Sequence, residues 1–280
     1  MPSENFIFSS NPANGAVNRS ADGSRFTIQF SDPFFLPANS YNARASIIQS
    51  NVWNVSPNIS PTLQNNILQV SDNNGVHTIQ IETGLYDLDT LATQIAHQID
   101  NIPLNRPAFP FKDMVNITGN ESTNRLYIEF KYNATLANLQ FIWQNSTVRD
   151  LMGFNATSLT RPTNPSTATT SFTLVSEDFP KFNQYNSFVI HSTLVNQGIR
   201  LNNSYDSILC QIPIKASVGE LDSFRSQEPS VFSLCNNLIG VQSQIWSVDF
   251  WLTSETNIPL DQRGEYWDFV LLLSWLESDQ

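Results

Sequence analysis

Alternating hydrophobic and polar positions near the start of the chain predict two strands. The segment RFTIQF at 25–30 alternates strictly, and the pattern stops at Asp32-Pro33. A second, less regular strand is expected at 43–55, before the two prolines of PNISPT at 57–62 break the sheet. A period of two residues is typical of a strand with one buried face.

After residue 171, every hydrophobic segment again has the length and spacing of a strand. The expected strands are 171–175, 187–194, 207–214, 231–234, 244–252 and 266–276. Together with the two N-terminal strands they number about eight, which is the complement of a jelly roll. We therefore predict a mainly β protein with a single jelly-roll sandwich built from 25–60 and 171–280.

The middle of the chain, 61–170, has a different pattern and predicts a small α+β insertion domain. A helix is expected at 84–100, where an apolar stripe follows the spacing of three and four residues and Asp87 can accept N–H bonds at the start. Strands are expected on both sides of this helix, including a hairpin that turns at Asn74-Gly75. A linker rich in Pro, Ser and Thr at 159–171 indicates the boundary of the domain.

The last expected strand is apolar on both faces. One face carries Trp267, Phe269, Leu271, Leu273 and Trp275, and the other carries Val270, Leu272 and Leu276. A fully buried central strand would cover both faces, and so would a subunit interface, and the sequence leaves both explanations open. The candidate interface residues are Trp267, Val270, Leu272 and Leu276.

The first 24 residues lack a periodic pattern. They contain one apolar cluster, Phe6-Ile7-Phe8. We expect a flexible or partner-docked arm at 1–24, with this cluster as the docking segment.

Composition limits the possible functions. The chain of 280 residues has 14 basic and 25 acidic side chains, a net charge of −11, and only 14% charged residues against a typical ~25%. No Lys or Arg cluster is present, which argues against direct nucleic-acid binding. The longest apolar run, 269–276, is far shorter than the ~20 residues of a membrane span, so no membrane insertion is expected. Low charge with 11% aromatic residues is instead typical of surfaces that form subunit contacts.

Residues suited to catalysis or metal binding are scarce. His77, His97 and His191 show no zinc-ligand spacing, and the 10 glycines form no phosphate-binding motif. Cys210 and Cys235 are expected to be buried thiols in a reducing compartment. No cofactor, metal site or catalytic residue is predicted.

Two carboxylate pairs are candidates for an acid and a base. Asp87 with Asp89 and Glu177 with Asp178 both lie near the start of an element, where carboxylates commonly accept helix or turn N–H bonds. Neither pair has a second cluster of ligands to complete a metal site. An enzyme therefore remains the weakest hypothesis, and it rests on Asp87 and Asp89 alone.

The order of several segments resembles the penton, or vertex, proteins of virophages and polinton-like viruses. In the front half these are RFTIQFSDPFFLP at 25–37, ASIIQSNVWNVSPNIS at 45–60, GLYDLDTLATQIAHQI at 84–99 and DLMGF at 150–154. In the back half they are SILCQIPI at 207–214, FSLCNNLIG at 232–240, QIWSVDFWLTSETNIPL at 244–260 and EYWDFVLLLSWL at 265–276. Met152 before Gly153-Phe154 departs mildly from the family's Leu-Gly-Phe-like turn.

This resemblance implies a structural capsid protein without catalytic residues. Five copies would form a homopentameric penton at each fivefold vertex of an icosahedral, double-jelly-roll-type virion assembled inside the host cell. The implied partners are further copies of the chain and the major capsid protein, and a vertex spike or fibre is a further candidate. A carbohydrate- or receptor-binding β-sandwich spike is the alternative, based on the surface rich in Asn, Thr and aromatic residues.

Overall fold

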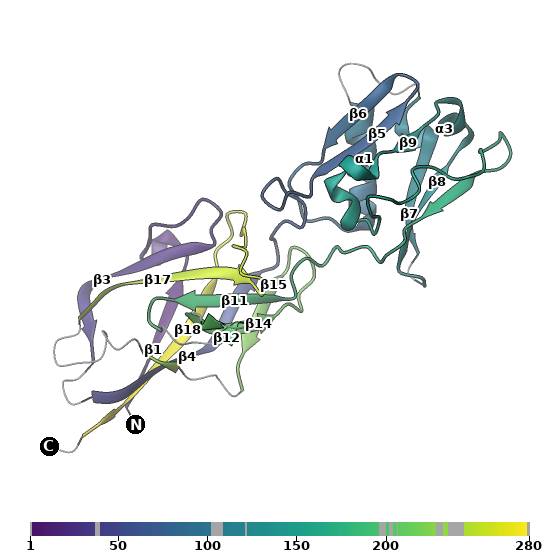
Figure 1. The fold of residues 1–280 in the computed structure, drawn as a ribbon. Helices are drawn as coiled ribbons and strands as arrows, with labels where there is room; N and C mark the ends of the chain where they lie inside the picture. The colour runs from purple at the N-terminus through teal and green to yellow at the C-terminus, as the bar shows by residue number, and fades with distance from the viewer. Residues whose placement is uncertain are drawn as a thin grey trace. The chain divides into compact units, whose positions relative to one another are not determined.

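The chain divides into two units (Figure 1). Each unit has its own hydrophobic core. A computed structural model describes every residue except 1, 37–39, 102–108, 121, 196–199, 202–203, 206, 228–231, 235–243 and 279–280. Unit 1 comprises Met1–Ser56 and Tyr185–Gln280, and unit 2 comprises Pro57–Gln184. We call them the sandwich unit and the insertion unit.

The sandwich unit contains two main antiparallel sheets. The first has the order β1-β18-β4-β15, with β16 also paired to β4, and the second has the order β14-β11-β17-β3-β2. The bounds are β1 Ser3–Ser9, β2 Ala16–Val17, β3 Arg25–Phe35, β4 Ser40–Trp53, β11 Ser187–Ser192, β14 Ile208–Pro213, β15 Leu221–Arg225, β16 Phe232–Ser233, β17 Gln244–Ser254 and β18 Asp268–Glu277. A short turn, η1 Pro12–Asn14, follows β1, and β12 Arg200–Leu201 pairs with β13 Ser204–Tyr205.

The topology of this unit is a jelly roll. Among the described residues, eight longer strands follow each other as β1, β3, β4, β11, β14, β15, β17 and β18. Numbered one to eight, they form one sheet in the order 1-8-3-6 and a second in the order 2-7-4-5. Each sheet thus interleaves strands from both ends of the chain, as two Greek keys do. The predicted fold class is confirmed.

An aromatic cluster fills the space between the two sheets. Phe8, Phe26, Phe250, Trp267 and Phe269 are each at most 5% exposed. Their ring centroids lie 4.9 Å apart in the Phe8–Phe250, Phe26–Trp267 and Phe250–Phe269 pairs. Large rings at alternate positions of both sheets therefore build the core, since such side chains bury the most apolar area per residue.

The identity of the eight strands differs from the expectation in four places. β15 was not expected, and among the described residues the strand expected at 231–234 is represented only by the two-residue β16. Residues 3–9 form the first strand, β1, which pairs with β18 from Ser3↔Ser274 to Ser9↔Asp268. The segment 1–24 is therefore not a separate arm. Conversely, 172–175 is not part of the sandwich, because β10 Phe172–Val175 pairs with β8 of the insertion unit.

The insertion unit contains two three-stranded sheets and one long helix. The sheets have the orders β6-β5-β9 and β10-β8-β7. The bounds are β5 Ile67–Asp72, β6 Gly75–Gln80, α1 Leu88–Asp100, α2 Phe111–Met114, β7 Val115–Asn120, β8 Arg125–Phe130, α3 Tyr132–Leu136, β9 Gln140–Phe141, η2 Trp143–Asn145 and η3 Thr147–Asp150. The predicted helix is confirmed, and its buried residues Leu91, Ile95 and Ile99 belong to the predicted stripe.

The insertion begins after the third strand of the jelly roll and is longer than expected. The unit boundaries lie at Ser56/Pro57 and Gln184/Tyr185, whereas the sequence placed them near 60 and 170. The difference arises because the supposed linker packs onto the insertion unit. Trp143 Nε1 donates to the carbonyl of Leu159, and Ser166 Oγ donates to the carbonyl of Phe130.

Candidate assembly surface

The outer face of β18 carries three of the four candidate interface residues. Val270, Leu272 and Leu276 are each half-buried, while the intervening positions of the strand are buried in the core. β18 is thus a central strand of its sheet, with β1 on one side and β4 on the other. Both faces of the strand carry apolar residues, and among the described residues only the inner face is fully buried.

Trp267 differs from the other three candidates. Its side chain is fully buried, its ring centroid lies 4.9 Å from that of Phe26, and its Nε1 donates to the carbonyl of Gly23 at 3.0 Å. The residue therefore lies in the core of the sandwich unit and not on the outer face of β18. Side chains two residues apart in an extended chain point to the same face. Trp267 precedes Phe269 by two residues, so both side chains point into the core.

The apolar cluster Phe6-Ile7-Phe8 is divided between two faces of β1. Phe8 is 5% exposed in the core and Phe6 packs against that core, so neither is free for docking. Ile7 points the other way and is 77% exposed. It stands directly opposite Val270, so the two side chains share one face of the sheet.

Further apolar residues extend this face across the sheet. Tyr41 pairs with Leu276 and is 49% exposed, and Leu221 of β15 pairs with Trp53 and is 42% exposed. We call Ile7, Tyr41, Leu221, Val270, Leu272 and Leu276 the outer apolar face. Ile7 was expected as part of a docking segment but not as part of a strand, and Leu221 was not singled out, because no strand was expected at 221–225.

Asp87 has a structural role at the start of α1. Its carboxylate accepts from the backbone N–H of Thr90 at 2.9 Å and from the Thr90 hydroxyl at 2.6 Å, while Thr90 Oγ1 accepts from the N–H of Asp87. The bonds from Thr90 hold the pKa of Asp87 below its usual value. A carboxyl group with a lowered pKa is a poor general acid at neutral pH, so the capping interpretation explains this residue.

Replacing Asp87 with alanine should therefore lower the free energy of unfolding by about 1 kcal/mol at pH 7. Because the folded pKa is lowered, the contribution of the charge is present above the ordinary pKa of Asp and disappears as the pH falls through the folded value. The difference between wild type and Asp87→Ala should thus shrink below about pH 4. Urea unfolding followed by circular dichroism checks this, with Asp87→Asn as a control that keeps the cap without the charge.

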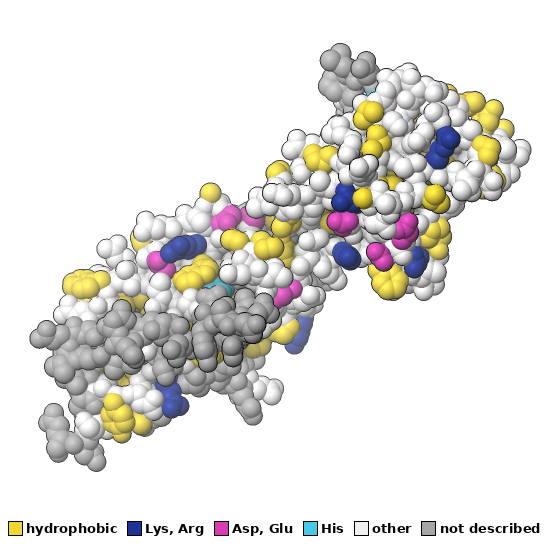
Figure 2. Space-filling view, in the orientation of Figure 1, with side chains coloured by type: hydrophobic (Ala, Val, Ile, Leu, Met, Phe, Trp, Pro, Cys, Tyr) yellow, Lys and Arg dark blue, Asp and Glu magenta, His cyan; other side chains and the backbone are white. Residues whose placement is uncertain are grey.

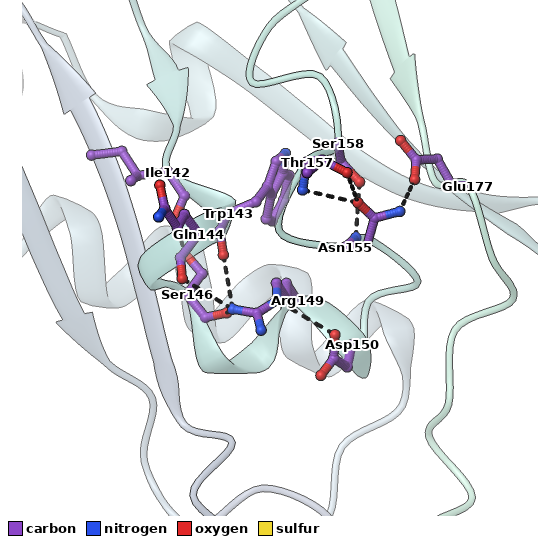
Figure 3. Close-up of polar contacts among 10 residues, drawn as sticks. All are labelled: Ile142, Trp143, Gln144, Ser146, Arg149, Asp150, Asn155, Thr157, Ser158 and Glu177. Atoms are coloured by element: carbon purple, nitrogen blue, oxygen red, sulfur yellow. Dashed lines mark hydrogen bonds and ion pairs between the residues drawn. The ribbon is translucent and has the colours of Figure 1, made fainter.

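Glu177, from the second carboxylate pair, also serves local structure. Glu177 accepts a hydrogen bond from Asn155 Nδ2, and Arg149 Nη1 donates to the carbonyls of Trp143, Gln144 and Ser146 (Figure 3). These bonds fix the turns that follow β9. The Glu177 carboxylate therefore helps to order the loop that contains Asn155.

The histidines are separated in the fold. His77 Nε2 lies 2.8 Å from Asp72 Oδ1 inside the β5–β6 hairpin, and His191 Nε2 lies 2.8 Å from Thr253 Oγ1 in the sandwich unit. His97 lies in the last turn of α1. Within the part of the chain that the structure describes, no three His, Cys, Asp or Glu side chains gather as a metal site would require.

The thiol of Cys210 is half-buried in β14. Burial raises its pKa to about 11, so the neutral thiol predominates at pH 7. Cys235, the second cysteine of the chain, lies outside the described residues. Among the described helices, none is long and apolar enough to cross a membrane.

Comparison with known proteins gives matches in structure only. No family model matches the chain, and no curated protein sequence matches it. The crystal structure of the mavirus penton protein superposes with a TM-score of 0.50 at 12% sequence identity, covering 98% of this chain and 99% of that chain. The chain has the fold of the mavirus penton protein.

The Sputnik virophage structure is a second match, with a TM-score of 0.43 at 14% identity and 98% coverage of each chain. The match to the mavirus protein covers nearly all residues, so it includes the insertion as well as the jelly roll. The resemblance to penton proteins noted in the sequence is thereby confirmed at the level of the fold.

Proposed function

We propose that this chain is a structural capsid protein that forms homopentameric pentons at the fivefold vertices of an icosahedral virion. The observation that carries the proposal is the full-length match to the mavirus penton protein, which covers both the jelly roll and the insertion of this chain. The proposed role is non-catalytic, and it places the chain in contact with further copies of itself and with the major capsid protein.

The outer apolar face supports self-association. Ile7 is 77% exposed beside the half-buried Val270, and the half-buried Leu272 and Leu276 continue the same row. One cationic side chain, Arg44, lies beside this row, because Arg44 pairs with Ser274. Apolar side chains grouped on one exposed face nevertheless resemble the buried centre of an interface more than an ordinary protein surface. We assign this face to contacts between neighbouring copies of the chain.

The low charge of the surface is consistent with this role. On the face shown in Figure 2, charged side chains are few and lie scattered among uncharged polar and hydrophobic ones. Fewer charges must then be desolvated when subunits meet, and long-range repulsion from the net charge of −11 is spread over the surface.

Replacing Ile7 or Leu272 with aspartate should prevent association. Each change places a charge in the proposed contact, where it would lose its hydration without gaining a partner. We expect wild type to have the mass of five chains in native mass spectrometry, and Ile7→Asp and Leu272→Asp to weaken association at least about 100-fold. Val76→Asp is the matched control, since Val76 is 62% exposed but lies in the insertion unit.

The two variants separate an interface from a core. Ile7 is so exposed that its replacement leaves the folded monomer intact, whereas Leu272 is half-buried. A wild-type chain that stays monomeric, or an Ile7→Asp variant that still forms pentamers, contradicts the assignment. If Leu272→Asp unfolds the chain, the face of β18 that carries Leu272 belongs to the core and is not a subunit contact. The vertex position is tested separately by locating the chain in the density map of a whole particle.

A further inference from the structure

A depression on the insertion unit combines an exposed aromatic ring with polar groups of both charges. It has a volume of about 520 Å³ and lies between the start of α1, the β7–β8 turn and the segment that follows β10. Its apolar side is formed by two aromatic residues, Phe179 and Phe182, and by Pro180. Its size is within the range of small-molecule sites in proteins.

The Phe179 side chain is exposed, but hydrogen bonds hold the backbone next to it in place. The ring is 60% exposed, a high value for a phenylalanine in a folded unit. Asp178 N donates to the carbonyl of Gly153 at 2.9 Å, and Ser176 Oγ donates to the carbonyl of Asp178 at 2.8 Å. A ring held by such a rigid segment can bind a ligand without a large loss of conformational entropy.

Gly153 shows how closely this segment is packed. Its φ is +80°, and a Cβ atom there would lie 2.3 Å from the carbonyl oxygen of Asp178. Only glycine combines this backbone conformation with this close approach. The turn at Gly153 therefore fixes the segment next to Phe179.

Arg125 argues against a cationic ligand. The guanidinium carbon lies 5.9 Å from the centroid of the Phe179 ring, and Nη1 donates to the carbonyls of Ser176 and Glu177. The ring thus already has a cationic neighbour. A second cation would be repelled by this charge, whereas a polar ligand could accept hydrogen bonds from the guanidinium.

The opposite rim supplies hydrogen-bond acceptors. Asp87, Asp89, Asn120 and Asn124 line it. Within the described residues, the Asp89 carboxylate and the Asn124 side-chain amide form no hydrogen bond. Two carboxylates disfavour an anionic ligand, so the site fits a neutral ligand with many hydroxyl groups and one apolar face.

We propose that this depression binds a neutral saccharide. The apolar face of a pyranose ring packs on Phe179, its hydroxyl groups donate to Asp89 and Asn124, and Arg125 donates to a ring or hydroxyl oxygen. This inference does not rest on the proposed capsid role. It gives the insertion unit a recognition function of its own, whichever assembly contains it.

Saturation-transfer NMR on the full chain tests the site with four probes: lactose, maltose, sialyllactose and tetramethylammonium. We expect lactose or maltose to bind with a dissociation constant of about 1 mM. Phe179→Ala should weaken this binding at least about tenfold, and Asp89→Asn should weaken it too. Leu159→Ala is the matched control, because Leu159 is 57% exposed on the same unit but lines a different depression.

The inference is overturned if neither neutral sugar binds at about 10 mM. It is equally overturned if only sialyllactose or only tetramethylammonium binds, since the site would then select a charged ligand. Sugar binding that survives Phe179→Ala unchanged places the site elsewhere and also contradicts the proposal. None of these outcomes bears on pentamer formation.

Discussion

Replacing Phe8 with alanine should destabilise the sandwich unit by about 3–5 kcal/mol. Although Phe8 lies near the start of the chain, its ring centroid is 4.9 Å from that of Phe250 and 5.7 Å from that of Phe269. Truncation would leave a cavity between the two sheets, because three strands meet at this point and cannot all move inward.

The neighbouring residue provides a matched control. Ile7 is 77% exposed on the other face of β1, so Ile7→Ala should change the stability of the monomer by no more than about 0.5 kcal/mol. Urea unfolding with hydrogen-exchange readout of β18 peptides measures the sandwich unit by itself. Equal effects of the two substitutions would mean that β1 is not part of the sandwich and that 1–24 is an arm after all.

This pair of residues also explains why the sequence did not predict β1. Phe6, Ile7 and Phe8 are three consecutive apolar residues, which hides the period of two that indicates a strand. The period is hidden because Ile7 is apolar although it is exposed. An outward-facing apolar residue is thus the reason for the missed strand and, at the same time, the strongest indication of a subunit contact.

The strand β15 was missed for the opposite reason. Of its inward-facing residues, Phe224 is apolar, but Asp222 is a buried carboxylate that accepts from the backbone N–H groups of Lys215 and Ala216. A buried polar residue whose bonding partners lie in a neighbouring turn interrupts the apolar alternation. No local pattern can indicate that such a carboxylate is satisfied.

The sequence did not show which of the two units the strand β10 would join. The residues of β10, Phe172 to Val175, alternate as a strand of either unit would, and the sequence correctly predicts a strand there. Pairing with β8 is decided by contacts across about 45 residues of chain, which local spacing does not encode. By contrast, α1 and its Asp87 cap were predictable, because both depend on residues within one or two turns.

Of the two candidate sites, one was predictable from the sequence and the other was not. The two-faced pattern of β18 was visible in the sequence and is present in the structure, including the half-buried Leu272. The depression at Phe179 could not be predicted, since it joins residues from three segments between Asp87 and Phe182. A site of this kind forms only when strand pairing has brought the three segments together.

Replacing Trp143 with alanine should destabilise the insertion unit by about 3–5 kcal/mol. Its ring is 1% exposed and stacks in parallel on Phe141 at 4.9 Å and on Phe154 at 4.2 Å. Nε1 also donates to the carbonyl of Leu159 at 2.9 Å. The substitution therefore removes ring contacts and leaves a backbone acceptor without its donor.

Trp143→Phe separates these two contributions. It keeps an aromatic ring for stacking but loses the N–H group, so we expect a loss of about 1–3 kcal/mol. Hydrogen exchange should show increased exchange in 159–166 for both variants, because the bond to Leu159 helps to hold that segment on the unit. Unchanged exchange there would restore the interpretation of 159–171 as a linker. Since each unit has its own core, exchange in β18 should remain at its wild-type rate in both variants.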